Sequence, residues 1–308
     1  DFTIVTANMN SGNTILHFLA ATCADLVMNQ ELVYAGQQFW DMKARFLKGT
    51  YTNKDVEAVE TQTDPKWRAE GPPANITDRD GNFAGAMINT RPPYCVSSIP
   101  FPDMMIAADH TRNPYEIYPR HATGLVMKGH NNEDILFINV YMDCHDKFGT
   151  KTRAILYYVG LLINAMKLSY ILMGDWQLTP QELASVGWLN TIDGYVIATD
   201  EITCLMKNRN TQGSVIDYAV VSNWIAPRVK YIRVTEDAAF SPHKYVEMRI
   251  SYKGARTQEL RAVKPKGFPE ERPIGPPNRN SNLDSPTRDD MEGDLEHQAR
   301  SVMGKIEG

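Results

Sequence analysis

The sequence has few cysteines, no long hydrophobic segment and no large excess of either charge. Its four cysteines form no CxxC pair, which argues against a zinc module or a disulfide-dense secreted scaffold. The longest nearly apolar run, residues 154–163, is about half of what a membrane-spanning helix requires. Lys and Arg number 32 and Asp and Glu number 37, which argues against a histone-like binder of polyanions. Any polyanionic partner must therefore meet a local site.

The start of the sequence carries no address signal. It runs directly into the strand-like segment FTIVTANMN, without the charged region and apolar core of a signal peptide. We therefore expect no membrane partner and favour an intracellular location, in the nucleus or the cytoplasm.

Composition changes near residue 253. Residues 253–266 hold five basic residues against one acidic residue, and the rest of the chain is rich in Pro, Asn, Asp and Glu. Few large apolar side chains are available there to offset the entropy lost on ordering. We expect one mixed α/β domain over residues 1–252. Residues 253–308 are expected to form a basic strip and then a disordered, Pro-rich, acidic tail or linker.

Hydrophobic periodicity predicts alternating strands and helices in the first part. The expected strands are 3–8, 25–29, 85–89, 124–127, 135–141, 170–173, 215–221, 229–234 and 245–251. The expected helices are 14–24, 36–47, 152–168 and 179–186. The last opens with Thr179, Pro180 and Glu182, the pattern of a capping box with Pro in the first turn.

Polar residues cluster where several of these strands begin or end. Asn8 and Asn10 close the first strand, and the others are Glu31, Tyr141, Asp175, Asp217 and His243. A hard divalent cation needs oxygen ligands, and an attacking water needs a base held in place by a third group. Each residue alone is better explained as a cap or a solvated turn, but together they can supply both requirements.

A family resemblance rests on six short motifs, which occur along the sequence in the order TANMN, NQE, NVY, GDWQLTP, SVIDYAVVS and SPH. Over about 240 residues, from Asn8 to His243, the sequence resembles the endonuclease/exonuclease/phosphatase superfamily of metal-dependent phosphoesterases. The resemblance implies a four-layer α/β/β/α sandwich, in which two mixed sheets pack face to face between outer helices with the site at one end.

The resemblance also implies roles for individual residues. Glu31 and Asp175 would bind Mg²⁺ (or Mn²⁺), and Asp217 would orient and charge His243. Asp175 would contact or activate the attacking water, and Tyr141 and Asn8 would complete the catalytic set. Substrate contacts would come from Gln177, Asn10 and Tyr141. By analogy with this family, the acidic, Pro-rich tail could tether a further domain, such as the polymerase of a retroelement.

Two positions depart from the family pattern. Gln177 stands where the family has Asn, which moves the amide outward by one methylene. Pro242 stands before His243 in place of an Asp, which removes a carboxylate and fixes the backbone φ before the base. Both changes are expected to weaken catalysis, because catalytic groups tolerate displacements of only about 0.5 Å from their productive positions.

We expect a phosphodiesterase of the endonuclease type that acts on nucleic acid, DNA rather than RNA. One alternative is a catalytically impaired or inactive member that acts as a binding module. Another is a phosphomonoesterase on an inositol or lipid headgroup, for which Arg112, Arg120 and Lys128 could supply a basic pocket.

Overall fold

The protein is described here by a computed structural model. The described residues are 1–9, 15, 18–19, 21–32, 41, 44, 67–70, 85–91, 94–99, 121–129, 132–142, 144, 147–205, 213–235 and 242–253. The predicted tail after residue 253, as well as Asn10, Arg112 and Arg120, lie outside them.

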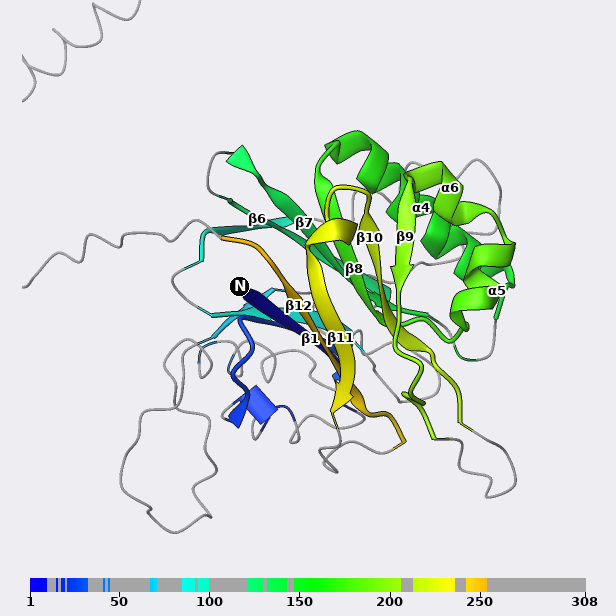
Figure 1. Ribbon diagram of the computed structural model, residues 1–308, viewed down its shortest axis with the longest axis horizontal. Helices are drawn as coiled ribbons and strands as arrows, with labels where there is room; N and C mark the ends of the chain where they lie inside the picture. Colours follow the sequence, from blue (N-terminus) through cyan, green and yellow to red (C-terminus); the bar gives the residue numbers. More distant parts are fainter. Residues whose placement is uncertain are drawn as a thin grey trace, which may run out of the picture. The chain divides into compact units, whose positions relative to one another are not determined.

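The described residues form two six-stranded mixed sheets (Figure 1). The first has the order β11-β12-β1-β2-β4-β3, with bounds β1 Phe2–Asn8, β2 Leu26–Leu32, β3 Arg68–Glu70, β4 Gly85–Thr90, β11 Val229–Thr235 and β12 Tyr245–Ile250. The second has the order β5-β6-β7-β8-β10-β9, with bounds β5 Val96–Ile99, β6 Ala122–Met127, β7 Ile135–Tyr141, β8 Ser169–Asp175, β9 Gly194–Ile197 and β10 Asp217–Ser222. In each sheet one central pair is parallel, β1 with β2 and β7 with β8, and the other pairs are antiparallel.

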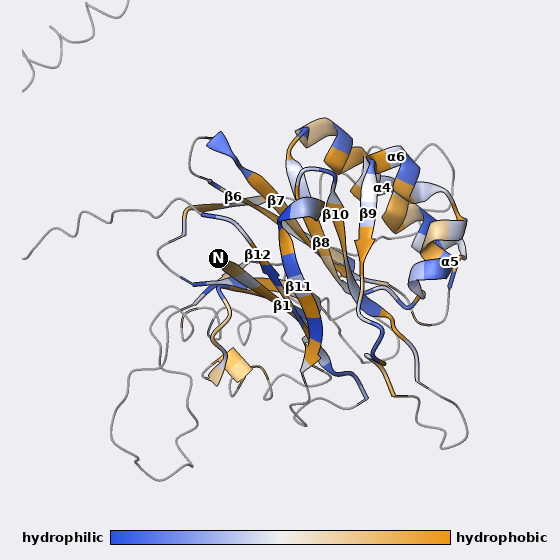
Figure 2. Ribbon diagram, viewed as in Figure 1, coloured by the Kyte–Doolittle hydropathy of each residue, from blue (hydrophilic) through white to orange (hydrophobic). Residues whose placement is uncertain are grey.

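Three apolar clusters separate four layers. One lies between the sheets, where side chains such as Ile4 and Met28 of the first sheet join Phe137 and Met173 of the second. Another lies between the second sheet and the helices, and the third covers the outer face of the first sheet. The central strands are accordingly apolar along much of their length (Figure 2). This arrangement confirms the predicted α/β/β/α sandwich.

The helices on the second sheet follow helical periodicity. They are α4 (Thr150–Met166), α5 (Pro180–Ser185) and α6 (Trp188–Ile192), and the short 3₁₀ helix η3 (Ala226–Arg228) precedes β11. The buried residues of α4 recur at three- and four-residue spacings, which gives it one apolar face. The predicted capping box of α5 is confirmed: the Thr179 hydroxyl accepts the Glu182 N–H, and the Glu182 carboxylate accepts the Thr179 N–H.

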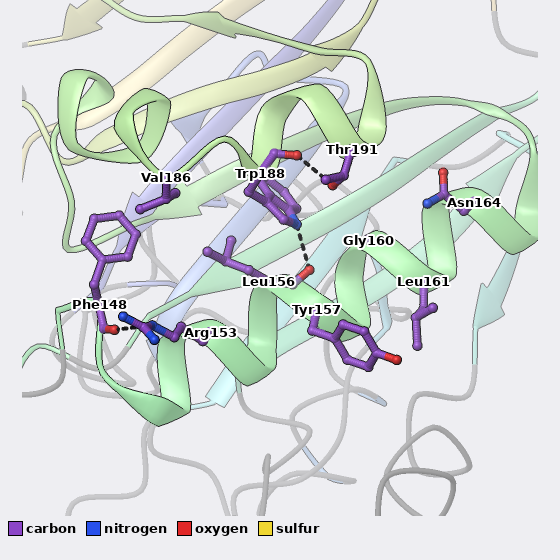
Figure 3. Close-up of a pocket in the computed structure, with 10 residues that line it drawn as sticks. All are labelled: Phe148, Arg153, Leu156, Tyr157, Gly160, Leu161, Asn164, Val186, Trp188 and Thr191. Atoms are coloured by element: carbon purple, nitrogen blue, oxygen red, sulfur yellow. Dashed lines mark hydrogen bonds between the residues drawn. The ribbon is translucent and has the colours of Figure 1, made fainter.

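An open groove of about 520 Å³ lies on the outer surface of these helices (Figure 3). The Trp188 indole forms part of its wall and donates a hydrogen bond to the Leu156 carbonyl, which ties α6 to α4. The exposed side chains of Tyr157, Leu161 and Val186 also line it. No predicted site residue lines this groove. Within the described residues, no helix has the length and apolar character needed to cross a membrane.

Nine predicted strands are confirmed as β1, β2, β4, β6, β7, β8, β10, β11 and β12, with ends shifted by a few residues at most. The predicted helices 152–168 and 179–186 are confirmed as α4 and α5. In the helix predicted over 14–24, the described residues 15, 18, 19 and 21 are helical, but residues 22–24 are not, so its predicted end is too late. In the helix predicted over 36–47, only residues 41 and 44 are described, and both are helical. The short elements β3, β5, β9 and α6 were not expected.

Candidate active site

The site arises where the inner face of each sheet changes from apolar to polar. Alternate residues of a strand share a face, so the row that begins with Phe2 and Ile4 in the inter-sheet core continues to Asn8. The same alternation leads from Phe137 to Tyr141 in β7 and from Met173 to Asp175 in β8. Because β7 and β8 are parallel and in register, Tyr141 lies beside Asp175. Strand β10 runs the other way, and its first residue, Asp217, pairs with Asp175.

Asp175 is fully buried at the end of β8 and is held by donors from two directions. The Asn8 amide of the other sheet donates to its Oδ2 at 3.0 Å, and the Gln177 amide donates to the same oxygen at 2.7 Å. The Gln177 backbone N–H donates to Oδ1 at 3.1 Å. Burial, followed by the negative charge of Asp217, raises the pKa of Asp175 to about 7. This carboxyl can therefore accept or donate a proton near neutral pH.

A glycine brings Asp175 close to β7. A Cβ on Gly174 would lie 1.8 Å from the Val140 carbonyl oxygen, so no larger residue fits between these strands. The Gly-Asp pair of the sequence is thus explained by packing as well as by chemistry.

His243 and Asp217 form a buried pair across the site. The imidazole Nδ1 lies 3.0 Å from Oδ2 and 3.2 Å from Oδ1 of Asp217, and both side chains are almost completely buried. Burial alone would lower the pKa of His243, but the Asp217 carboxylate outweighs it and raises the pKa to about 12. The imidazole is therefore a cation at neutral pH. Its Nε2 faces the Asp175 carboxylate at 3.7 Å.

Thr203 supports this pair, although no motif in the sequence marked it as a site residue. Its buried hydroxyl accepts the backbone N–H groups of both Ile216 and Asp217 at 3.0 Å. These bonds fix the backbone where β10 begins. The next residue, Cys204, forms backbone bridges to Ser214 on one side and His243 on the other, and its Sγ lies 3.6 Å from the His243 Nε2.

Glu31 reaches the site through an irregularity in β2. The pairing of β2 with β4 shifts register between Asn29 and Leu32, and Glu31 has a left-handed φ of 56°. Such a bulge redirects a side chain that regular alternation would send to the outer face. The Tyr141 hydroxyl donates to the Glu31 Oε1 at 3.1 Å. Burial and the charges of Glu31 and Asp175 raise the pKa of Tyr141, so it stays a neutral donor.

Buried amides join the two sheets beneath the site, and the sequence analysis did not identify these either. The Gln30 side chain of β2 donates to the Asn139 Oδ1 of β7. Asn139 in turn donates to the carbonyls of Asn29 and Met87 at 2.7 and 2.9 Å. Gln30 and Asn139 could have been recognised in the sequence, because each is a polar residue at an inner-face position of an otherwise apolar strand.

Comparison with known proteins identifies the fold. No protein-family model matches the sequence, and no curated protein matches it either. Solved structures do match. The endonuclease domain of TRAS1, a telomere-specific non-LTR retrotransposon, is 13% identical with a TM-score of 0.55, over 81% of this chain and 98% of that one. The 3′ phosphatase NExo from Neisseria, bound to a product DNA hairpin, is 16% identical with a TM-score of 0.57, over 82% and 100%. AP endonuclease LMAP from Leishmania major is 11% identical with a TM-score of 0.55, over 82% and 88%.

The chain has the endonuclease/exonuclease/phosphatase fold. Within that fold, the structure brings Asn8, Asp175, Asp217 and His243 together through direct contacts. It also joins Glu31 to Tyr141, which lies beside Asp175.

The endonuclease/exonuclease/phosphatase fold implies a divalent cation, and the donor set fits one. Among the described residues, Oε1 of Glu31 accepts the Tyr141 hydroxyl and Oε2 has no donor. Mg²⁺ typically uses one or two carboxylates and keeps several waters. Donor atoms of Asp175, Asp217 and His243 also lie within 4.8 Å of one another. A protonated imidazole has no lone pair to offer a metal, however, so His243 fits an ion pair with Asp217 better than a ligand set.

Proposed function

We propose that the protein is a divalent-metal-dependent phosphodiesterase that hydrolyses the backbone of nucleic acid, DNA in preference to RNA. The observation that carries the proposal is the Asp217–His243 ion pair facing the near-neutral carboxyl of Asp175. An acid and a base with well-separated pKa values are what phosphoester hydrolysis needs at one phosphorus centre.

The residues divide the chemistry between them. The ionised form of Asp175 takes a proton from the attacking water, and its pKa of about 7 suits that task at neutral pH. The His243 imidazolium faces the negative charge that develops on the phosphoryl oxygens, and Asp217 keeps it charged and oriented. Asn8 holds Asp175 through its amide, and the Tyr141 hydroxyl positions Glu31.

Glu31 and Asp175 are the residues that would hold Mg²⁺ or Mn²⁺. When bound, the cation supplies positive charge that neutralises the phosphate. Its presence would also favour the ionised form of Asp175.

The direct test compares wild type with His243→Ala on abasic or nicked duplex DNA, with Mg²⁺ or Mn²⁺ and with a chelator. We expect His243→Ala to lose about 10²- to 10³-fold in rate, as is typical when one group that stabilises the negative charge of the transition state is removed. Glu201→Ala, an exposed carboxylate on the loop after β9, is the matched control and should keep full activity. Equal rates for wild type and His243→Ala would refute the proposal.

One observation favours a binding module as a second candidate. The Gln177 amide is engaged by the Asp175 carboxylate at 2.7 Å, and position 242 is a proline with no carboxylate. An inactive wild type that gains activity as Pro242→Asp combined with Gln177→Asn would support that candidate. If the wild type and the double variant were both inert and still bound metal tightly, a binding module would also be favoured over the enzyme, whereas an active wild type would contradict this second candidate.

Among the described residues, no comparable observation supports a phosphomonoesterase that acts on an inositol or lipid headgroup. Of the three basic residues considered for its pocket, only Lys128 is described, and its ammonium group forms a salt bridge with Asp134.

A further inference from the structure

The groove on the outer surface of α4, α5 and α6 collects much of the apolar surface that the described residues leave exposed (Figure 3). Five large hydrophobic side chains in that part of the chain are exposed, and three of them line the groove: Tyr157, Leu161 and Val186. Hydrophobic residues that are exposed singly are normal, whereas apolar side chains that gather in one patch mark an interaction site. The groove is therefore a candidate binding surface.

The groove is elongated along α4. Its α4 wall is a ridge of residues at spacings of four, four and three, which places them on one face of the helix: Arg153, Tyr157, Leu161 and Asn164. At a rise of about 1.5 Å per residue, this ridge is about 16 Å long, which is three helical turns. Figure 3 shows Phe148 and Arg153 at one end of the groove and Asn164 at the other.

The floor of the groove is fixed by the packing of α6 on α4. The Trp188 indole donates to the Leu156 carbonyl at 2.8 Å. Gly160 permits this approach, because a Cβ at that position would lie 3.3 Å from the indole nitrogen. The Trp188 side chain is thereby buried against α4. A groove whose walls are already in place loses little entropy when it binds a partner.

An open groove beside a helix favours an amphipathic helix as its occupant. Pockets for small ligands bury most of the ligand surface, which a groove that is open to solvent along one side does not do. An amphipathic helix needs cover for one apolar stripe only and keeps its polar face in water. Apolar residues at positions i, i+4 and i+7 of such a helix would contact successive turns of the α4 ridge.

Charge favours an acidic partner. Among the described residues that line the groove, Arg153 alone is charged, and α4 contains no Asp or Glu. The Arg153 Nε donates to the Phe148 carbonyl at 2.9 Å, which holds the guanidinium at one end of the groove. Within the described ranges, Arg153 has no carboxylate partner, so a carboxylate of the occupant can pair with it without displacing another acid.

We propose that this groove is a docking site for an amphipathic helix of a partner protein, with its apolar stripe along the α4 ridge and a carboxylate at the Arg153 end. The proposal does not depend on the hydrolytic function, because no residue of the candidate active site lines the groove. Nucleic acid is a poorer match, because its binding rests on several phosphate contacts and the groove offers one cation.

The probe is a synthetic peptide of about 15 residues, with leucines at positions i, i+4 and i+7 and two glutamates at one end. A hydrocarbon staple on its polar face keeps it helical, and a matched peptide carries lysines in place of the glutamates. Fluorescence anisotropy gives the dissociation constant of each labelled peptide with the full chain. We expect saturable binding of the glutamate peptide and binding of the lysine peptide that is weaker by about fivefold or more. Equal affinities, or no binding of the glutamate peptide, would overturn the proposal.

Two exposed positions of the ridge show whether the peptide lies in the groove. Arg153→Glu should reverse the preference, so that the lysine peptide binds more tightly than the glutamate peptide. Leu161→Gln should weaken binding of the glutamate peptide by about fivefold or more. Tyr195→Gln is the matched control and should leave the affinity unchanged, because Tyr195 is 46% exposed, against 44% for Leu161, and lies on β9 outside the groove. An unreversed preference in Arg153→Glu, or an unchanged affinity in Leu161→Gln, would refute the assignment.

Other occupants of the groove would give different results. A wild type that sediments as a dimer and dissociates as Leu161→Gln would assign the groove to a second copy of the chain and overturn the proposal. Displacement of the glutamate peptide by a single-stranded oligonucleotide would assign it to nucleic acid instead. A monomeric wild type from which the oligonucleotide displaces no peptide would support the helical partner.

Discussion

Replacing Asp217 by Asn tests the physical core of the site, because it removes one charge and keeps the shape. In the native protein, Asp217 outweighs the burial of His243 and holds its pKa at about 12. In Asp217→Asn, burial is opposed only by the hydrogen bond to Cys204 and the charge of Asp175, so the pKa of His243 should fall well below its native value of about 12. The imidazolium should then lose its proton at a lower pH than in the native protein.

The cost to stability depends on pH in a definite direction. Because the folded-state pKa of His243 is raised, the ion pair contributes fully below pH 6.5, and its contribution is lost as pH rises toward 12. Removing one partner of a buried ion pair costs about 3–5 kcal/mol. We therefore expect Asp217→Asn to lower the free energy of unfolding by about that amount at pH 6 and by less at pH 9.

Denaturant unfolding followed by circular dichroism at the two pH values measures this difference, and NMR titration of the His243 ring reports its pKa. Glu247→Gln is the control, because Glu247 lies in another part of the first sheet, where it pairs with the exposed Arg233 and accepts the Tyr231 hydroxyl, and its loss should have the same effect at pH 6 and pH 9. An equal loss at pH 6 and pH 9, or a His243 that still titrates above pH 9 in the variant, would refute the electrostatic account.

Three further predictions concern Asp175, Thr203 and the capping box of α5. Asp175→Asn should abolish hydrolysis but raise the melting temperature at pH 8. The pKa of Asp175 is raised in the folded protein, so its ionisation costs stability as pH rises from about 3.8 to 7. Calorimetry should therefore show the gain in melting temperature at pH 8 and no gain below pH 4. Thr203→Val should lower the free energy of unfolding by about 2 kcal/mol, because two buried N–H groups lose their acceptor, and Thr203→Ser should restore most of it in the same denaturation assay. Glu182→Ala should cost about 1 kcal/mol at pH 7, and because hydrogen bonds from Thr179 lower the pKa of Glu182, the difference from wild type should shrink as pH falls below 4.5.

Much of the fold could be predicted because its longer strands carry their own signal. The runs that became β1, β7, β8 and β10 are apolar, flanked by turns, and end in polar residues. The short strands β3, β5 and β9 have three or four residues each, which is too few for a periodic pattern. They exist because neighbouring strands offer unpaired backbone groups, a property that is not local to their own sequence.

The site residues can also be divided into those that the sequence predicts and those that depend on strand pairing. Asn8, Asp175, Asp217 and His243 could be predicted because chemistry requires those side chains and their place in the sequence order is distinctive. Thr203 acts by accepting two backbone N–H groups from residues more than ten positions away, so its role exists only once β10 has paired.

Cys204 shows how far such pairing can change the meaning of a residue. In the sequence it is one of four scattered cysteines, for which an inert, reduced thiol is the simplest interpretation. The antiparallel bridge to His243 sets its sulfur against an imidazole that Asp217 keeps positively charged. Any change that weakens the Asp217–His243 pair, such as Asp217→Asn, should therefore reduce stability and the proposed hydrolysis together.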